Sequence, residues 1–165
     1  MSDLQPGTGP RRRVVVGVDG TPNSLAALRR AADQAGQRDA RLEIVYVIPA
    51  GANGAAEASG YEMLNMAVRH VSPRGLDRPA DRLVARGKAA ETLVQLSAGA
   101  ELLVIGARIH SGYGNLLGGD VVSYCLSHAR GTVDICADQR AHAAQPAAQA
   151  AGRSGACPPR SQGVK

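Results

Sequence analysis

The chain has 165 residues, 44% of them hydrophobic, which is enough for one domain with a sizeable buried core. Aromatic residues make up only 2%, with no Phe or Trp, which excludes a platform of exposed rings for single-stranded nucleic acid. The net charge of +5 resides at the two ends, because residues 14–136 carry 12 basic and 12 acidic side chains. This distribution argues against a nucleic-acid-binding face on the domain.

Both ends of the sequence lack the composition of a packed domain. Residues 1–12 are rich in Gly, Pro and Arg, and residues 137–165 in Ala, Gln, Gly and Pro, so we expect both to be disordered. No secretion signal is recognisable, and no stretch reaches the roughly 18 apolar residues of a membrane span. The sequence therefore predicts a cytoplasmic protein that binds no membrane. Three cysteines without metal-type or redox-type spacing fit reduced thiols; they are Cys125, Cys136 and Cys157.

Apolar runs and helical repeats alternate between these ends. The β-branched run 13–19 predicts a strand buried on both faces. Thr21 followed by Pro22 predicts the start of a helix, and Gly36 predicts its end. Residues 42–48 predict a second strand. A glycine-rich connection and a helix over 61–71 follow it.

The second half continues the alternation, and the whole order predicts the fold. Strands are expected at 82–86, 101–107 and 132–136, with a helix over 88–98 and a last helix from Asp120 or just after it. The order βαβαβαβαβ predicts an open parallel α/β sheet with helices on both faces, because right-handed crossovers are the common solution. Ligands in such sheets bind beyond the carboxyl ends of the strands, where the winding direction reverses.

The loops after the first and fourth strands are therefore the candidate site. Asp19 follows the first strand, where it could bind a ribose or a metal or could equally cap the next helix. Five glycines lie within residues 106–119, and such a loop before a helix offers backbone amides to an anion. Neither GxxxxGK[ST] nor GxGxxG occurs in the sequence. Four scattered histidines form no acid–base group.

Three segments, in order, resemble a universal stress protein domain. They are VVVGVDGTPNSLAALRRAADQA, LEIVYVIP and GKAAETLVQLSAGAELLVIGARIHSGYGNLLGGDVVSYCLSHA, and the similarity covers residues 13–136. The resemblance implies a Rossmann-like fold of the adenine-nucleotide α-hydrolase type, with five strands in the order 3-2-1-4-5. It also implies a homodimer formed through strand 132–136. The family divides into members that bind ATP and members that do not.

In ATP-binding members a loop reads Gly, two residues, Gly, nine residues, then Gly followed by Ser or Thr. By this resemblance Gly106 and Gly119 match the first and third glycines, and Asp19 matches the acidic residue of the first loop. The resemblance also gives Val47 as the residue whose backbone meets adenine. Ile105 and Val121 match the apolar positions that flank the loop.

Two residues depart from this motif: Ile109 replaces the second glycine, and Asp120 replaces the Ser or Thr. A β-branched residue costs about 1–2 kcal/mol where a turn needs a positive φ. A carboxylate about 4 Å from a phosphate charge repels it by about 1–4 kcal/mol, and Asp120 would cap the last helix itself. Arg108 and His110 could compensate in part. We therefore expect ATP to bind weakly if at all, and Mg²⁺ to bind only with nucleotide.

The last predicted strand reads TVDIC, with Asp134 at its centre. A charge on an edge strand discourages pairing, so a dimer through 132–136 would be weaker than usual unless Asp134 points to solvent.

The sequence therefore predicts a non-enzymatic regulatory protein of universal stress type with an altered nucleotide pocket and an unknown protein partner. The alternative is a working ATP or AMP binder that signals occupancy through loop 107–119, with slow hydrolysis. A phosphoacceptor receiver domain is not indicated, because the acidic pair after the first strand and the Lys after the fifth are missing.

Overall fold

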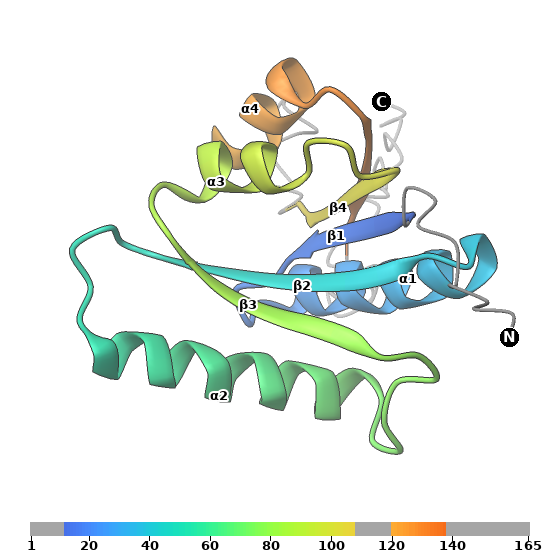
Figure 1. Cartoon of the computed structure of the whole chain (residues 1–165), viewed down its shortest axis with the longest axis horizontal. Coiled ribbons are helices and arrows are strands. Elements are labelled where there is room, and N and C mark those ends of the chain that lie inside the picture. Colours follow the sequence, from blue (N-terminus) through green and yellow to red (C-terminus); the bar gives the residue numbers. More distant parts are fainter. Residues whose placement is uncertain (1–11, 108–119, 138–165) are drawn as a thin grey trace, which may run out of the picture.

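A computed structural model describes residues 12–107 and 120–137 of the chain. Strands and helices alternate along it: β1 (Arg13–Gly17), α1 (Pro22–Arg38), β2 (Arg41–Ile48), α2 (Gly54–Val71), β3 (Ala80–Arg86), α3 (Ala89–Leu96), β4 (Leu102–Gly106), α4 (Asp120–His128) and β5 (Thr132–Cys136). The strands form one parallel sheet in the order β3-β2-β1-β4-β5 (Figure 1). The predicted fold and strand order are confirmed.

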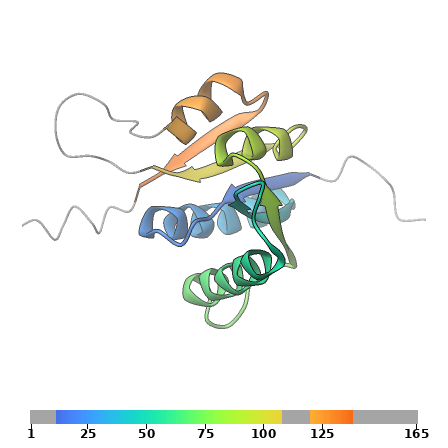
Figure 2. The same ribbon diagram turned by 90° about the vertical axis from the view of Figure 1, so that its left-hand side faces the viewer.

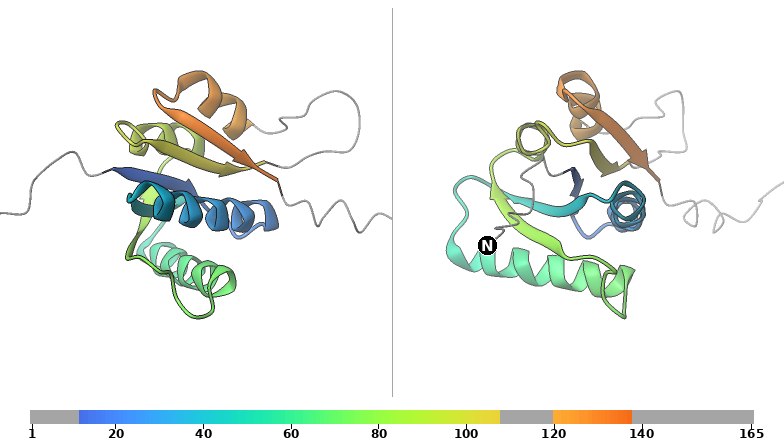
Figure 3. Two further views of the ribbon diagram at one scale, coloured as in Figure 1. Left: turned by 90° about the vertical axis from the view of Figure 1, so that its right-hand side faces the viewer. Right: turned by 45° about the vertical axis from the view of Figure 1, so that its right-hand side comes forward.

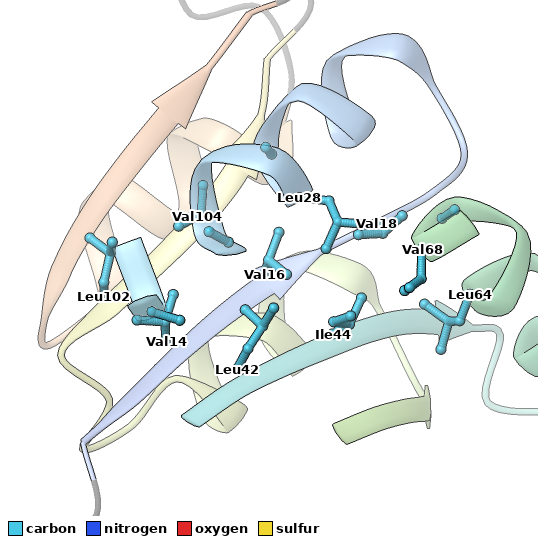
Figure 4. Packing of buried hydrophobic residues seen from close by; sticks show 14 of the residues in the cluster. Val14, Val16, Val18, Leu28, Leu42, Ile44, Leu64, Val68, Leu102 and Val104 are labelled. Carbon is cyan, nitrogen blue, oxygen red and sulfur yellow. The ribbon is translucent and has the colours of Figure 1, made fainter. Parts of the chain in front are cut away.

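Helices cover both faces of this sheet. The ribbon views place α1 and α2 on one face and α3 and α4 on the other (Figure 2, Figure 3). Because side chains alternate along a strand, Val14 and Val16 of β1 enter the core under α1 and α2, while Val15 enters the core under α3 and α4. Leu28 of α1 and Leu64 of α2 pack against the first of these cores (Figure 4). β1 is thus buried on both faces, as its β-branched run predicted.

The first helix, α1, begins as predicted and ends later. Thr21 is its N-cap and Pro22 is its first residue. The helix continues through Gly36 to Arg38, where Asp39 takes the left-handed conformation (φ 51°) and donates its N–H to the carbonyl of Gly36. Aspartate tolerates this conformation better than most residues, so the helix can end there without a glycine. The predicted end at Gly36 is wrong.

The second helix, α2, begins at Gly54, inside the stretch that the sequence predicted to be a connection. Asn53 caps it by accepting the N–H of Ala56 at 3.0 Å. Gly60 lies within the helix, where a Cβ would approach side chains of β2 and β3 to 3.0 Å. This glycine permits close helix–sheet packing and does not mark a loop. Neither α2 nor any other helix in the described part of the chain is long and apolar enough to cross a membrane.

Cys125 and Cys136 lie in different cores. Cys125 on α4 is fully buried under α3 and α4, whereas Cys136 at the end of β5 packs against the core on the α1 side. Both are free thiols, and burial raises the pKa of each. The predicted reduced state agrees with this placement for these two residues; Cys157 lies outside the described residues.

Arg13, the first residue of β1, joins three elements near the amino end of the sheet. Its Nη1 donates to both carboxylate oxygens of Glu43 on β2, at 2.9 and 3.1 Å. Its Nη2 donates to the carbonyls of Leu96 and Ala98, at the end of α3, at 3.3 and 2.9 Å. Carbonyls in the last turn of a helix have no partner within it, so Arg13 supplies a donor to Leu96, the last residue of α3, and a second donor to Ala98 just beyond the helix. The ion pair is partly buried, with side-chain exposures of 29% and 19%.

We predict that Arg13→Leu lowers the free energy of unfolding by about 2 kcal/mol, because Glu43 is left without its partner in a partly buried site. Chemical denaturation measures the change. The control is Arg12→Leu, whose side chain is 62% exposed beside Glu101 and whose loss should cost less than about 1 kcal/mol. Adding Glu43→Leu to Arg13→Leu should recover part of the loss. Equal effects of the two single changes would contradict the assignment.

Candidate functional site

A cavity of about 460 Å³ lies at the carboxyl ends of β1, β2 and β4, against the first turns of α1, α3 and α4. Between β1 and β4 the winding direction of the sheet reverses, which is where open parallel sheets bind ligands (Figure 1). The volume lies within the range of small-molecule sites. A cavity therefore lies where the sequence predicted a site.

Predicted site residues from distant parts of the sequence line this cavity. They are Asp19, Val47, Ile105, Gly106 and Val121. Asp120 is the first residue of α4, exposed and directly before Val121. The other residues singled out for the loop, Arg108, Ile109, His110 and Gly119, lie outside the described residues. The five lining residues thus lie around one cavity, as the sequence predicted. What each of them does there stays a prediction.

Most of the cavity wall is apolar. Val45 and Val47 come from β2, Leu93 from α3, and Ile105 from β4, with Val122 of α4 beside them. Of these, Val45, Leu93, Ile105 and Val122 are each less than 5% exposed, so they belong to the core that the cavity opens onto. An apolar wall of this kind suits the weakly polar part of a small ligand.

Asp19 orders the turn between β1 and α1. Its Oδ1 accepts the N–H of Thr21 at 3.0 Å and the hydroxyl of Thr21 at 2.6 Å. The Thr21 hydroxyl oxygen in turn accepts the N–H of Ser24 at 3.3 Å. Gly20, between them, has φ 82°, which favours glycine. Of the two uses considered for Asp19, the support of the helix start is therefore observed. The described part of the chain holds no group of three or more His, Cys, Asp or Glu that could bind a metal.

Sequence reasoning missed Ser24, which is only 3% exposed and lines the cavity. Its hydroxyl donates to the carbonyl of Thr21 at 2.9 Å and accepts the N–H of Asp19 at 3.2 Å. The available signal was a lone polar residue on the face of α1 that also buries Ala27 and Leu28. Leu93 was also missed as a wall residue, because its contact with Gly17 is long-range. A Cβ on Gly17 would lie 2.8 Å from that leucine side chain.

Gly106 has a packing role that the family motif alone does not reveal. A Cβ at this position would lie 2.5 Å from the carbonyl carbon of Asn23 and 2.6 Å from the amide nitrogen of Ser24. Both are backbone atoms in the first turn of α1, and neither can swing aside as a side chain would. The end of β4 therefore meets α1 backbone to backbone, and this contact forms one side of the cavity.

The model of the universal stress protein family matches residues 10–136. The chain belongs to the universal stress protein family. Two curated universal stress proteins of Mycobacterium tuberculosis, from strains CDC 1551 / Oshkosh and ATCC 25618 / H37Rv, are each 33% identical to it over 103 residues. The match covers 59% of this chain but only 38% of each relative, so the chain spans well under half of their length.

Solved universal stress protein structures share the fold. A universal stress protein in complex with cAMP is 28% identical, with a TM-score of 0.61 over 77% of this chain and 97% of that one. A protein from Lactobacillus plantarum is 20% identical, with a TM-score of 0.62 over 76% of this chain and 97% of that one. One from Archaeoglobus fulgidus in complex with dAMP is 21% identical, with a TM-score of 0.60 over 78% and 99%. At these identities the last two show the fold alone.

We predict that Gly106→Ala lowers the free energy of unfolding by about 1–3 kcal/mol, because the new methyl group must push backbone away from backbone. Thermal or denaturant unfolding checks this. The matched control is Gly36→Ala, which lies in α1 with nothing within 4 Å of its Cβ position and should stabilise the protein by up to about 1 kcal/mol. A Gly106→Ala protein as stable as the unmodified chain would show that the contact is not tight.

Proposed function

We propose that this universal stress protein is a non-enzymatic, cytoplasmic regulator in the stress response whose cavity holds an adenine ligand but disfavours ATP. The apolar wall to which Val45, Leu93 and Val122 contribute suits a purine ring, and Asp19 lines the same cavity, where a sugar hydroxyl could donate to it. A related protein in complex with cAMP supports the adenine preference. Any Mg²⁺ would arrive with a nucleotide.

The observation that carries the proposal is Asp120 at the start of α4. The amino end of a helix attracts anions through its unpaired amides and its dipole. Here the first residue of the helix is a carboxylate, and the next two residues, Val121 and Val122, line the cavity. A phosphate group bound at this helix end would meet a negative charge that the chain already supplies. At about 4 Å this repulsion amounts to about 1–4 kcal/mol for each pair of charges.

The alternative is an ATP- or AMP-binding protein that signals occupancy through loop 107–119 and hydrolyses ATP slowly. The related protein in complex with cAMP is compatible with it, because cAMP carries a phosphate. In that case Arg108 and His110 would provide the positive charge for the phosphates. The two functions differ in how tightly the unmodified chain binds a triphosphate.

We predict that the unmodified chain binds ATP with Mg²⁺ more weakly than about 1 mM, and that Ile109→Gly with Asp120→Ser strengthens binding at least about tenfold, since about 1.4 kcal/mol of repulsion is removed. Isothermal titration calorimetry measures both. Asp33→Ser is the control, because it removes the same charge from the exposed side of α1. Sub-millimolar binding by the unmodified chain would favour the alternative. No gain in the double variant would contradict the account of the site.

We further propose that the protein forms a homodimer through β5, the edge strand of the sheet. Asp134 of this strand does not stand alone: its Oδ2 accepts from Nε of Arg30 on α1 at 2.9 Å. The hydrogen bond to Asp134 raises the pKa of Arg30. The pair offsets the charge that would otherwise oppose a second edge strand. To the two possibilities considered from the sequence, a repelling Asp134 and a solvent-facing one, the structure adds an ion pair at the surface.

We predict that Arg30→Ala raises the dissociation constant of the dimer, because two unpaired Asp134 carboxylates would then face each other near the axis. Arg29→Ala, the neighbouring exposed arginine, is the control and should leave the dissociation constant nearly unchanged. Asp134→Val should lower it. Sedimentation velocity at several protein concentrations measures all four proteins. Monomers at every concentration for both the unmodified chain and Asp134→Val would rule out pairing through β5.

A further inference from the structure

We propose that a groove at the amino end of the sheet, away from the cavity described above, binds a small primary amine with an apolar body. The groove has a volume of about 560 Å³, which lies within the range of small-molecule sites. It runs between the second half of α1 and the segment 71–78, which ends α2 and leads to β3. Figure 1 shows the end of α1 and this connection at the same end of the sheet. Among the described residues, the groove and the cavity share no lining residue, so their ligands would not compete.

The floor of the groove is apolar. Ala35 and Leu42 are at most 3% exposed and belong to the core beneath α1 and α2. Ala32, Val71 and Leu76 pack against the same core and are only partly buried. Covering this floor removes apolar surface from water, which favours a ligand with a compact hydrocarbon or aromatic body.

Small residues of α1 leave room for such a body. Ala32 and Gly36 lie one turn apart on the side of the helix that lines the groove. A Cβ built on Gly36 would meet no atom of another element within 4 Å among the described residues. The other wall is a closed turn, in which the Ser72 hydroxyl donates to the carbonyl of Gly75 and the Gly75 N–H donates back to the carbonyl of Ser72 at 2.9 Å. The space is therefore bounded by ordered backbone on both sides.

Two carboxylates stand at the rim of the groove. Asp33 belongs to the α1 wall and Asp77 to the opposite wall, and both are exposed. Neither carboxylate takes part in any ion pair between described residues. Asp33 does interact electrostatically with Arg30, but that arginine donates its hydrogen bond to Asp134. Both carboxylates can therefore accept from a ligand.

Two arginines also line the groove, and they help to decide the class of ligand. Arg78 is already paired with Asp39. Arg29 lies one turn before Asp33, about 6 Å along the helix axis, and has no ion pair within the described ranges. The lining side chains that stay unpaired are thus two carboxylates, Asp33 and Asp77, and one guanidinium, Arg29.

A ligand with one positive charge balances this set of charges. An ammonium group can donate a charge-assisted hydrogen bond to either carboxylate. A zwitterion would leave the excess negative charge as it is, and an anionic ligand would add to it. The carbonyl ends of α1 and α2 both adjoin the groove and also favour a cation. The basic residues of these last turns offset part of that effect but do not line the groove; they are Arg38, Arg69 and His70.

The experiment is titration of the full isotope-labelled chain with four probes of similar shape: phenethylamine, phenethyl alcohol, hydrocinnamate and phenylalanine. Two-dimensional NMR follows the backbone amides and gives both the place and the strength of binding. We expect the largest shifts at the groove, on Ala32, Gly36 and Leu76. The amine should bind about threefold to fivefold more tightly than the alcohol, as for an exposed ion pair, and hydrocinnamate most weakly. Added salt should narrow the gap between amine and alcohol.

Three variants separate the charge from the shape of the groove. Asp77→Asn should weaken the amine about threefold and leave phenethyl alcohol nearly unchanged. Glu62→Gln is the control, because it removes an exposed carboxylate of α2 that does not line the groove, and it should change neither affinity. Gly36→Leu should weaken both probes, because a larger side chain then occupies the groove wall.

Each contrary outcome overturns the proposal. Shifts confined to the other cavity, on Val47 and Ile105, would show that the amine binds elsewhere. Phenylalanine or hydrocinnamate binding as tightly as the amine would contradict the preference for a single positive charge. So would an advantage of the amine that survives Asp33→Asn combined with Asp77→Asn. Failure of all four probes to bind would remove this site and leave the proposed adenine function untouched, because that function depends on the other cavity.

Discussion

The end of β4 and the first turn of α1 meet without a side chain between them, and the cavity depends on this contact. Gly106 leaves room for the backbone of Asn23 and Ser24, and a single methyl group would fill that room. The close approach brings α1 against the point where the sheet reverses its winding direction. It also sets Thr21 and Asp19 at the cavity mouth. A glycine first recognised as part of a loop motif thus acts as a spacer between two elements of the core.

Much of the architecture could be predicted from the sequence, because the signals for it are local. The β-branched run of β1 and the Thr21–Pro22 start of α1 both depend on neighbours a few residues away. The errors concern the ends of helices, where several neighbouring residues could start or end the same helix. Asp39 ended α1 in place of Gly36, and Asn53 started α2 inside a glycine-rich stretch. Propensity does not decide between such neighbouring caps.

The site was predictable in place but not in detail. The switch-point rule located the cavity, and the family resemblance supplied residues that line it. The signal for Ser24, a lone polar residue on the buried face of α1, was overlooked, whereas Leu93 was missed because its contact with Gly17 joins positions that the sequence does not identify as neighbours. The same holds for Arg30, whose pairing with Asp134 joins positions far apart in the chain. A sequence shows how many charged side chains a protein has, but only the fold shows which of them form ion pairs.

Arginine performs structural work here that lysine could not. Arg13 uses two nitrogens of one planar group to reach a carboxylate on β2, the carbonyl of the last residue of α3 and the carbonyl of Ala98 just beyond it. A lysine ammonium is a single point and could not serve both sides in fixed geometry. The ion pairs of Arg12, Arg41 and Arg78 lie towards the same end of the sheet, away from the cavity. Several of the described arginines thus form ion pairs that join different elements of the domain.

The two layers of the molecule are unequal. In the described residues the core beneath α1 and α2 contains seventeen buried residues, whereas the core beneath α3 and α4 contains eight. Local opening costs the least free energy where the least apolar surface is buried, so we expect the layer with fewer buried residues to open more readily. Leu93, Val121 and Val122 belong to that layer and to the cavity wall. A ligand bound in the cavity would therefore stabilise the layer of α3 and α4. While the ligand is bound, the backbone amides of these two helices would exchange their hydrogens with water more slowly.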